Sequence, residues 1–356
     1  MSYNEKNLMR LLTHSNPLVI HHWDADGVIS AATLATYIGQ ELEFESPPFE
    51  YKIDENYLEM LSTKAENHDT IVILDLNLPS KYLVSLSAKL GKPVISIDHH
   101  TTNDTPKSVS VIYYNPAKNG DPEGLWPSAA HVIASLTGSY DPLLISSSIV
   151  GDLDNAAKNN KVFKKYMNEI GLDPIDDFEM PLNCSLQIWG AEAMGKIDII
   201  KTLPSSLAYG GLDPCYALLS DPVLTTLRLE AEEELNSLIN KTENKLEKIK
   251  ENIYFAKIDG KARLISKISR EISYKHPNDI IMIGYLAKST GNASIYIRTR
   301  KDDINLFSML ENLKNLGYQV GGKFQLGNNV LAIDVETENL DKAINNIIDY
   351  IKNKNF

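Results

Sequence analysis

The strongest constraint on the fold of this chain is the alternation of short apolar runs with helical patterns in its first half. The apolar runs, which we expect to be buried strands, are PLVIHHW (17–23), TIVILDL (70–76) and PVISIDHH (93–100). The helical patterns that follow are 28–39, 80–91 and 127–138. Strands that alternate with helices predict an α/β fold with a mostly parallel sheet and helices on both of its faces.

The second half of the chain has a different pattern. Residues 222–253 carry Leu, Ile and Ala at helical spacing among many Glu and Lys, which predicts a long amphipathic helix. This connecting helix separates a first domain, 1–221, from a second domain, 254–356. In the second domain we expect strands at YFAKI (254–258), ARLISKI (262–268), IIMIGYL (280–286), ASIYIRTR (293–300) and NVLAIDV (329–335), with helices at 305–317 and at the end of the chain. The sequence thus predicts a smaller α/β C-terminal domain.

Net charge limits the partners of the chain. Its 356 residues carry a formal charge of −12. Proteins that bind long nucleic acids usually present a basic surface, because neutralising phosphates drives non-specific binding. The acidic composition therefore argues against tight duplex binding, and it leaves single strands and short oligonucleotides open through a local basic groove or bound metals.

The compartment can be predicted from what the sequence contains. The start, MSYNEKNLMRLL, has no apolar signal-peptide core, and no apolar run approaches the roughly 20 residues that cross a bilayer. Two cysteines, Cys184 and Cys215, are too few for a disulfide framework and form no CxxC pair. We expect a cytoplasmic protein that does not associate with a membrane.

Acidic and histidine residues gather after each apolar run. The four clusters are His22-Trp23-Asp24-Ala25-Asp26-Gly27, Asp75, Asp98-His99-His100 and Gly151-Asp152-Leu153-Asp154. The fourth follows LLISSSIV (143–150), which we interpret as another buried strand. Ligands of open α/β sheets bind at the carboxyl ends of the strands, so the clusters are expected to meet. Taken alone, Asp75 is typical of a helix cap and paired histidines are typical of a surface; four clusters in succession favour a shared site.

The residue types in these clusters indicate the chemistry of that site. Carboxylates gathered in one crevice repel each other and raise one another's pKa unless a cation intervenes. Mixed carboxylate and imidazole donors suit Mn²⁺, Fe²⁺, Co²⁺ or Zn²⁺ better than Ca²⁺. Two such ions can activate a water and stabilise an in-line displacement at phosphorus. The clusters therefore predict hydrolysis of a phosphate ester.

The four motifs HWDADG, ILD, DHH and VGDLD resemble those of the DHH phosphoesterase superfamily, in the family's order. The resemblance implies two Mn²⁺ ions, with Mg²⁺ or Co²⁺ as alternatives. It implies that His22 and Asp24 hold one ion and that Asp75 bridges both. The ligands it implies for the other ion are Asp26, His99 and Asp152.

The resemblance also implies roles beside the metals. His100 would contact the scissile phosphate, and Asp98 would orient a neighbouring imidazole. Together with Asp75 they form the expected catalytic set. Asp154 is the alternative acid of the fourth motif, although Asp152 fits better.

The second domain is similar to the family's DHH-associated domain, which implies that substrate lies between the two domains. Members usually carry a GGGH-like motif there, whereas this chain has Gly321-Gly322-Lys323-Phe324, with Gly327 shortly after. The glycines would let backbone amides approach a phosphate, and Lys323 would replace the missing histidine as a positive group. A simple glycine turn between a helix and a strand is the alternative.

A strand arginine is the other expected substrate contact. Arg298 in SIYIRTR resembles the family arginine that holds a substrate phosphate. Arg300 lies on the same strand face and is the alternative.

Three functions remain open on this resemblance. The segment between the third and fourth motifs resembles archaeal RecJ-like nucleases in its NP…G…SA stretch, which favours an exonuclease that degrades single-stranded DNA or RNA from an end. A phosphatase of short oligonucleotides (nanoRNA) or pAp is the alternative. A third hypothesis is a replisome-associated scaffold, although such relatives lack several ligands that this chain retains. A replication or repair protein partner and a homodimer are both left open.

Overall fold

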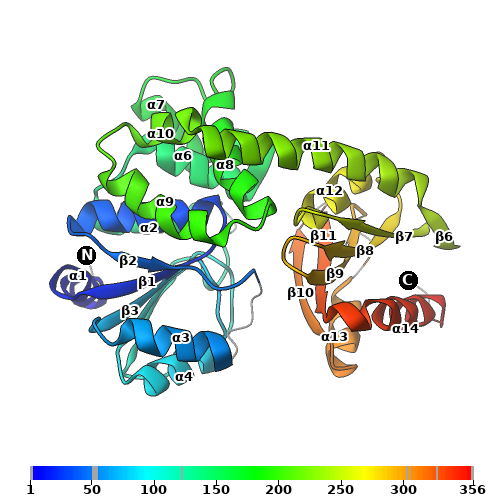
Figure 1. Cartoon of the computed structure of the whole chain (residues 1–356), viewed down its shortest axis with the longest axis horizontal. Coiled ribbons are helices and arrows are strands. Elements are labelled where there is room, and N and C mark those ends of the chain that lie inside the picture. The colour runs from blue at the N-terminus through cyan, green and yellow to red at the C-terminus, as the bar shows by residue number, and fades with distance from the viewer. Residues whose placement is uncertain are drawn as a thin grey trace. The chain divides into compact units, whose positions relative to one another are not determined.

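The computed structural model describes residues 3–49, 55–121, 123–301, 304, 306–325 and 328–353. The chain forms two compact units (Figure 1). The first unit contains residues 1–192 and 196–228, and the second contains residues 193–195 and 229–356.

The first unit is built on a five-stranded parallel sheet with the strand order β2-β1-β3-β4-β5. Its strands are β1 (Pro17–His21), β2 (Glu43–Glu45), β3 (Thr70–Leu74), β4 (Val94–Ile97) and β5 (Val111–Tyr114). Strands β1, β3 and β4 are buried along their whole length, which explains why they appear in the sequence as continuous apolar runs. The predicted α/β fold with a parallel sheet is confirmed.

Helices cover both faces of this sheet, as Figure 1 shows. One face packs against α1 (Tyr3–His14), α2 (Ala25–Ile38) and α5 (Ala129–Thr137). The other face packs against α3 (Glu55–Ala65) and α4 (Ser80–Leu90). Neighbouring strand residues serve opposite faces, with Val19 in the first core and Leu18 in the second.

The remainder of the first unit is helical. Its elements are α6 (Pro142–Leu153), the 3-10 helix η1 (Asp154–Asn159), α7 (Lys161–Glu169), α8 (Glu179–Ala193), α9 (Ile197–Tyr209) and α10 (Pro214–Ser220). Helix α2 contacts both α6 and α9, so it is covered on the side away from the sheet. In the described part of the chain, every helix is too short or too polar to span a bilayer.

The strand expected at 143–150 is wrong, because these residues lie in α6. Asp141 caps this helix by accepting the backbone N–H of Leu144, and Pro142 occupies its first turn. The hydroxyl groups of Ser146 and Ser147 donate to carbonyls one turn back, so the serines are satisfied inside the buried helix. A buried helix and a buried strand therefore show the same apolar run.

The connecting helix is shorter than expected. Helix α11 (Pro222–Asn244) ends at Asn244 and not at 253. The residues beyond it form β6 (Glu247–Lys250), which pairs with β7 (Ile253–Gly260). Pairing with the sheet thus replaces the last turns of the expected helix.

The second unit is a six-stranded mixed sheet with the order β10-β11-β9-β8-β7-β6, in which only β7 and β8 are parallel among the described pairs. Its other strands are β8 (Ile280–Ala287), β9 (Asn292–Thr299), β10 (Gln319–Gln325) and β11 (Asn328–Val335). Its other helices are α12 (Ile265–Lys275), α13 (Leu306–Asn315), the short η2 (Thr337–Asn339) and α14 (Leu340–Asn353). Helices α13 and α14 share one apolar core with the sheet, whereas α12 contacts β8 and β9.

Two expectations in the second unit are corrected. The strand expected at 262–268 is wrong, because Ile265, Ile268 and Ile272 form the buried stripe of helix α12. The alternative of a glycine turn at Gly321-Gly322 is also wrong, because both residues pair with β11 as part of the edge strand β10. The side chain of Lys323 and the whole of Gly327 lie outside the described residues.

Candidate metal centre

The first part of the site is the turn that joins β1 to α2. Asp24 caps α2 by accepting the backbone N–H of Gly27 through Oδ1 at 3.0 Å. Its Oδ2 lies 2.7 Å from Nδ1 of His22. A Cβ atom at Gly27 would lie 2.3 Å from the carbonyl oxygen of His22, so the turn requires glycine there. The HWDADG motif therefore presents the imidazole and a carboxylate together.

Asp75 lies directly after β3 and is buried, with 2% of its surface exposed. Its φ of 60° is left-handed, a conformation that few residues other than glycine, asparagine and aspartate adopt. The two oxygens of its carboxylate have different neighbours: Oδ2 lies 3.8 Å from Nδ1 of His22, and Oδ1 lies 3.5 Å from Nε2 of His99. Asp75 therefore lies between the first cluster and the third.

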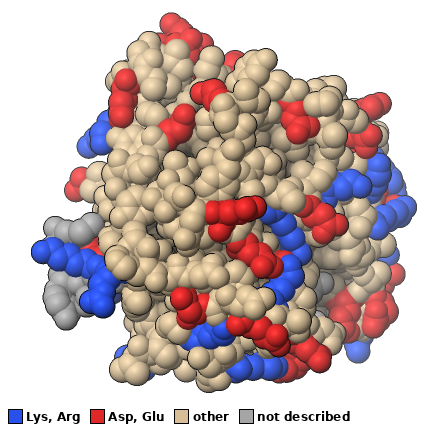
Figure 2. All heavy atoms as spheres, turned by 60° about the vertical axis from the view of Figure 1, so that its left-hand side comes forward, with Lys and Arg blue, Asp and Glu red and all other residues tan. Residues whose placement is uncertain are grey.

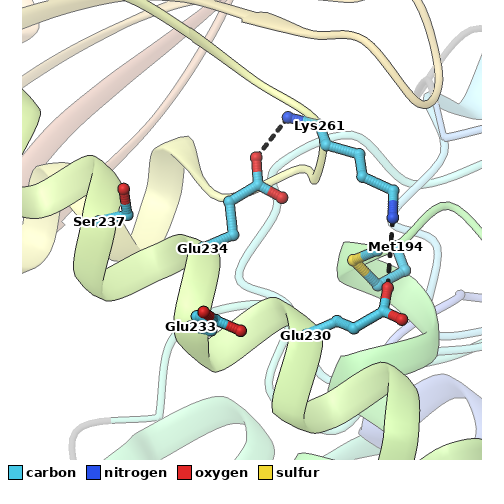
Figure 3. Close-up of a pocket in the computed structure, with 6 residues that line it drawn as sticks. All are labelled: Met194, Glu230, Glu233, Glu234, Ser237 and Lys261. Carbon is cyan, nitrogen blue, oxygen red and sulfur yellow. Dashed lines mark hydrogen bonds and ion pairs between the residues drawn. The ribbon is translucent and has the colours of Figure 1, made fainter.

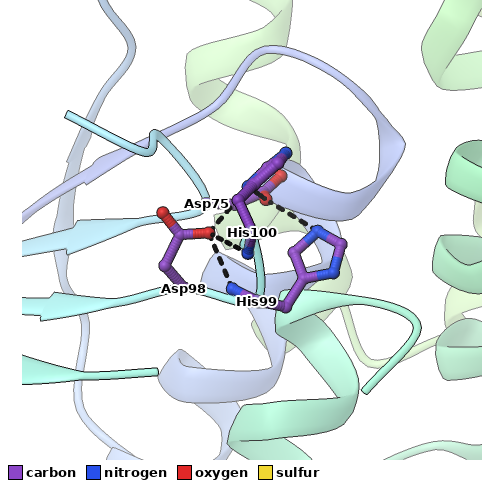
Figure 4. Close-up of side chains that lie close together, drawn as sticks. All are labelled: Asp75, Asp98, His99 and His100. Carbon is purple, nitrogen blue, oxygen red and sulfur yellow. Dashed lines mark hydrogen bonds and ion pairs between the residues drawn. The ribbon is translucent and has the colours of Figure 1, made fainter. Parts of the chain in front are cut away.

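The third cluster follows β4 and is organised around Asp98, as Figure 4 shows. One oxygen of Asp98 accepts the backbone N–H groups of His99 and His100 and the Nδ1–H of the His100 ring at 2.7 Å. The other oxygen accepts the backbone N–H of Asn77 at 2.7 Å. Asp98 thus fixes the backbone of both histidines and the ring of His100.

The remaining carboxylates approach the ring of His99. Its Nε2 lies 3.0 Å from Asp152 and 3.6 Å from Asp26. Asp26 is completely buried, and its two oxygens accept the backbone N–H groups of Ala129 and Ala130 at 2.6 and 3.0 Å. These amides begin α5, where the helix dipole favours a negative charge.

The fourth cluster reaches the site from a helix end and not from a strand end. Asp152 lies in the last turn of α6, whereas Asp154 begins η1. Asp152 belongs to a group of three possible donors and Asp154 to none of the groups found among the described residues.

Three groups of metal-ligating side chains occur in the described part of the chain, and all lie at this site. In each group the donor atoms lie within 4.8 Å of one another. The groups are His22, Asp24 and Asp75; Asp26, His99 and Asp152; and Asp75, Asp98, His99 and His100. The structure thus brings together all eight of the first-domain residues expected from the sequence.

Burial and mutual repulsion dominate the electrostatics of the carboxylates. Burial, together with the charges of Asp26 and Asp24, raises the pKa of Asp75 well above its usual range. Burial and the charge of Asp152 raise the pKa of Asp26 to about 8. Both carboxylates are therefore disfavoured in their charged form without a cation.

Neighbouring opposite charges favour the charged forms of His99 and Asp24. Burial acts to lower the pKa of His99, but the nearby carboxylates of Asp152 and Asp75 raise it well above the ordinary value. Burial acts to raise the pKa of Asp24, but the neighbouring His22 lowers it below its usual range. The site therefore attracts positive charge strongly.

The donor atoms fit divalent metal ions. Among the described residues, Oδ1 of Asp75 and Nε2 of His99 are buried and have no hydrogen bond of good geometry. Buried polar atoms without such partners are costly, and a bound cation would satisfy both. The mixture of carboxylate and imidazole donors suits transition metals such as Mn²⁺.

Three contacts at the site were not anticipated from the sequence. Nδ1 of His99 lies 3.2 Å from the carbonyl oxygen of Trp126, and the side-chain amide of Asn115 donates to the carbonyl of His100 at 2.8 Å. The third is the pair of α5 amides on Asp26. Two of these use backbone atoms, which leave no residue-type signal; Asn115, directly after β5 and before a proline, offered a weak one.

The expected substrate residues lie in the second unit. Arg298 is buried, and its Nε donates to Oγ of Ser269 on α12 at 3.3 Å. The guanidinium of Arg300, directly after β9, lies 3.4 Å from the ring centre of Tyr274 on the same helix, so both arginines contact α12. Burial and the charges of Arg270 and Arg300 lower the pKa of Arg298 to about 10. The arginines thus form a positive group, of which Arg270 was not anticipated.

Gly321 is open to solvent on the edge strand. A Cβ atom built there would meet nothing within 4 Å. Neither the backbone conformation nor the packing therefore requires glycine at position 321.

A separate hollow lies in the second unit (Figure 3). It is lined by Met194, Glu230, Glu233, Glu234, Ser237 and Lys261. Two of its three glutamates are engaged by Lys261, whose Nζ lies 3.2 Å from Glu230 and whose backbone N–H donates to Glu234. These glutamates form none of the metal-ligating groups described above.

Comparison with known proteins agrees with this geometry. Residues 17–154 match the N-terminal domain of the DHH family. No curated protein sequence matches the chain. Among solved structures, exonuclease RecJ bound to manganese is similar over 99% of this chain and 94% of that chain, with a TM-score of 0.69 and 16% identity.

Two further structures share the fold. RecJ from Thermus thermophilus in complex with Mn²⁺ has a TM-score of 0.68 and 14% identity over 99% of this chain, which spans 54% of that longer protein. CDC45 from Entamoeba histolytica has a TM-score of 0.51 and 10% identity, with 97% of this chain and 98% of that chain covered.

The parallel sheet and the metal-ligating groups lie within the part of the chain that matches the DHH family. Residues 17–154 are thus similar to a DHH-family N-terminal domain, and the fold of the chain is RecJ-like.

Proposed function

We propose that this chain is a divalent-metal-dependent phosphodiesterase that removes mononucleotides from an end of single-stranded DNA or RNA. One observation carries the proposal: the two oxygens of Asp75 face different histidines, His22 and His99, each with its own carboxylates. This is the arrangement that a carboxylate shared by two cations requires.

In this proposal each ion has its own ligands, and Asp75 serves both. His22 and Asp24 hold one ion, a pair joined at 2.7 Å on the β1–α2 turn. The ligands of the other ion are Asp26, His99 and Asp152. When bound, two divalent ions such as Mn²⁺, with Mg²⁺ or Co²⁺ as alternatives, lower the pKa of a water and stabilise the oxygens of an in-line displacement at phosphorus.

The chain itself positions the substrate phosphate through His100. Asp98 accepts the Nδ1–H of this ring, which fixes its orientation and leaves Nε2 for another partner. The His100 side chain is 30% exposed, so a phosphate oxygen can reach it. In its charged form His100 would donate to Asp98 and to the phosphate at once.

A positive group in the second unit supports a nucleic-acid substrate. The charges of Arg270 and Arg300 lie close enough to Arg298 to lower its pKa. A group of three arginines attracts phosphates. The likeness to RecJ exonucleases concerns the fold, and it agrees with this substrate class.

Short substrates are the second candidate. On the face drawn in Figure 2, Lys and Arg side chains form small groups among Asp and Glu and make no continuous basic surface there. With a net charge of −12, this favours short oligonucleotides or pAp over long strands. The scaffold hypothesis is weaker, because every expected first-domain ligand is present and grouped.

A substrate panel tests these alternatives. The full chain with Mn²⁺ is incubated with a single strand labelled at either end, a dinucleotide and pAp, and with EDTA as control. We expect metal-dependent release of mononucleotides from one end of the strand. A preference for the dinucleotide or pAp would support the second candidate, and no hydrolysis of any substrate would contradict both.

A further inference from the structure

We infer that Asp121 is a positioning residue for the metal centre, because its carboxylate holds the segment that orients His99 and Asp26. This segment, residues 121 and 123–130, is called the strap. The inference rests on the proposed function in that it assigns the oriented side chains to a metal site.

The carboxylate of Asp121 organises the first half of the strap. Its Oδ1 accepts the backbone N–H of Leu125 at 2.8 Å, and its Oδ2 accepts the backbone N–H of Trp126 at 2.6 Å. A second tie comes from Asn160, whose side-chain amide donates to the carbonyl of Gly124 at 2.8 Å. The peptide unit at Trp126 is therefore fixed by a side chain outside any helix or strand.

Trp126, held in this way through its N–H, orients the His99 ring through its carbonyl group, which lies in the next peptide unit. The carbonyl oxygen of Trp126 lies 3.2 Å from Nδ1 of His99. A carbonyl can only accept, so this contact places a proton on Nδ1 and leaves the lone pair of the neutral ring on Nε2. Nε2 is the atom that lies near Asp152, Asp75 and Asp26.

The second half of the strap holds another ligand of the same group. Ser128 caps α5, and the following amides of Ala129 and Ala130 bind both oxygens of Asp26. His22 and Asp24 are instead placed by the β1–α2 turn. The strap therefore supports the group that contains Asp26 and His99, and loss of Asp121 should weaken that group selectively.

Removal of the Asp121 carboxylate should leave the fold intact. The first half of the strap lies near the surface, where Leu125 is 43% exposed, so water can satisfy the two released N–H groups. Partners that orient a metal-ligating histidine typically contribute about 10- to 100-fold to metal affinity. The effect should therefore appear in metal binding before it appears in stability.

The test compares wild type, Asp121→Ala, Asp121→Asn and the control Asp173→Ala as full-length proteins. Asp173 also accepts two backbone N–H groups in a surface turn, those of Ile175 and Asp176, so its removal matches the loss of hydrogen bonds away from the site. Asp121→Asn retains one acceptor oxygen and keeps the test usable if the alanine variant fails to fold.

The first readout uses metal-free protein. Nitrogen-15 NMR of histidine-labelled chains, with His99 assigned through His99→Gln, reports which ring nitrogen carries the proton. At a pH high enough to make the His99 ring neutral, we expect an Nδ1-protonated ring in wild type and in Asp173→Ala, and a mixture of tautomers in Asp121→Ala. A His99 spectrum that Asp121→Ala leaves unchanged would overturn the inference.

The second readout is the Mn²⁺ binding isotherm, followed by electron paramagnetic resonance of free Mn²⁺. We expect Asp121→Ala to weaken one of two sites by about 10- to 100-fold and the other by less than about twofold, with Asp121→Asn between it and wild type. Equal weakening of both sites would overturn the inference. If wild type binds no Mn²⁺, the proposed function fails, whereas the metal-free spectra still decide the role of Asp121.

Discussion

Oδ1 of Asp98 accepts both the backbone N–H and the ring Nδ1–H of His100. The carboxylate is buried, and the histidine it holds is partly exposed. Burial acts to raise the pKa of Asp98, but its hydrogen bond from His100 lowers it below the ordinary value. The carboxylate therefore stays charged and keeps the ring in one orientation.

His100→Ala should reduce the rate of hydrolysis by about 10²–10³-fold, the usual effect of losing one donor to a developing negative charge. Bound metal should be unchanged, because the ring is held by Asp98. Activity and metal content are measured on the same sample. Loss of metal would instead make His100 a ligand.

Asp75→Asn should lower activity below about 1% of wild type, because one neutral amide cannot serve two cations. Asparagine tolerates the left-handed backbone at this position, so the fold should be retained. At about pH 9 the metal-free variant should also melt at a higher temperature than metal-free wild type, since the amide cannot ionise beside Asp24 and Asp26. Activity assays and thermal unfolding by circular dichroism check the two effects. A variant with substantial activity would refute the bridging role.

Binding of Mn²⁺ at pH 7 should release about one proton or more. The pKa of Asp26 in the metal-free protein is about 8, so its carboxyl is mostly protonated at pH 7 and must lose that proton to bind a cation. His99, whose pKa is also raised, adds to the release. Isothermal titration calorimetry in phosphate and in Tris measures this number. Binding heats that are equal in the two buffers, after dilution is subtracted, would contradict it.

His131 should make the stability of the first unit depend on pH. Burial lowers the pKa of its ring to about 4, whereas the unfolded value is about 6.5. Between these values the unfolded chain binds a proton that the folded chain rejects, so stability is complete above about pH 6.5 and declines as pH falls towards 4.

The test for His131 is chemical unfolding at about pH 7.5 and about pH 5.0 in EDTA, on either side of the unfolded pKa. His131→Gln should lose about 2 kcal/mol less than wild type between the two conditions. His14→Gln, at the exposed end of α1, is the control and should behave like wild type. An identical pH dependence in all three proteins would exclude this role for His131.

Much of the first unit could be predicted because β1, β3 and β4 are fully buried and are followed by acidic and histidine residues. Apolar runs such as TIVIL clearly indicate buried strands. Apolar packing does not explain the presence of the charged residues Asp75 and Asp98 at the ends of these strands. The metal-ligating groups follow from the same logic, since parallel strand ends meet at one edge.

Two strands were predicted wrongly because short apolar segments fit a helix as well as a strand. Contacts made by backbone atoms were missed because they do not depend on residue type. The window 262–268 alternates like a strand, and only the addition of Ile272 reveals the helical stripe of α12. Residues 143–150 contain serines, which are unusual in a buried helix. Their hydroxyl groups are satisfied by carbonyls of the same helix, which the sequence does not indicate. The amides of Ala129 and Ala130 could not have been found from residue types at all.

The placement of Asp152 on α6 has a consequence for synthesis of the protein. As the chain emerges from the ribosome, β1, β3 and β4 are available early, and they bring Asp24, Asp75 and Asp98 with them. Asp152 and the α5 amides that hold Asp26 appear later. A nascent chain thus carries an unfinished, mutually repelling set of acids, and it acquires its full capacity for cations only after translation has passed α6.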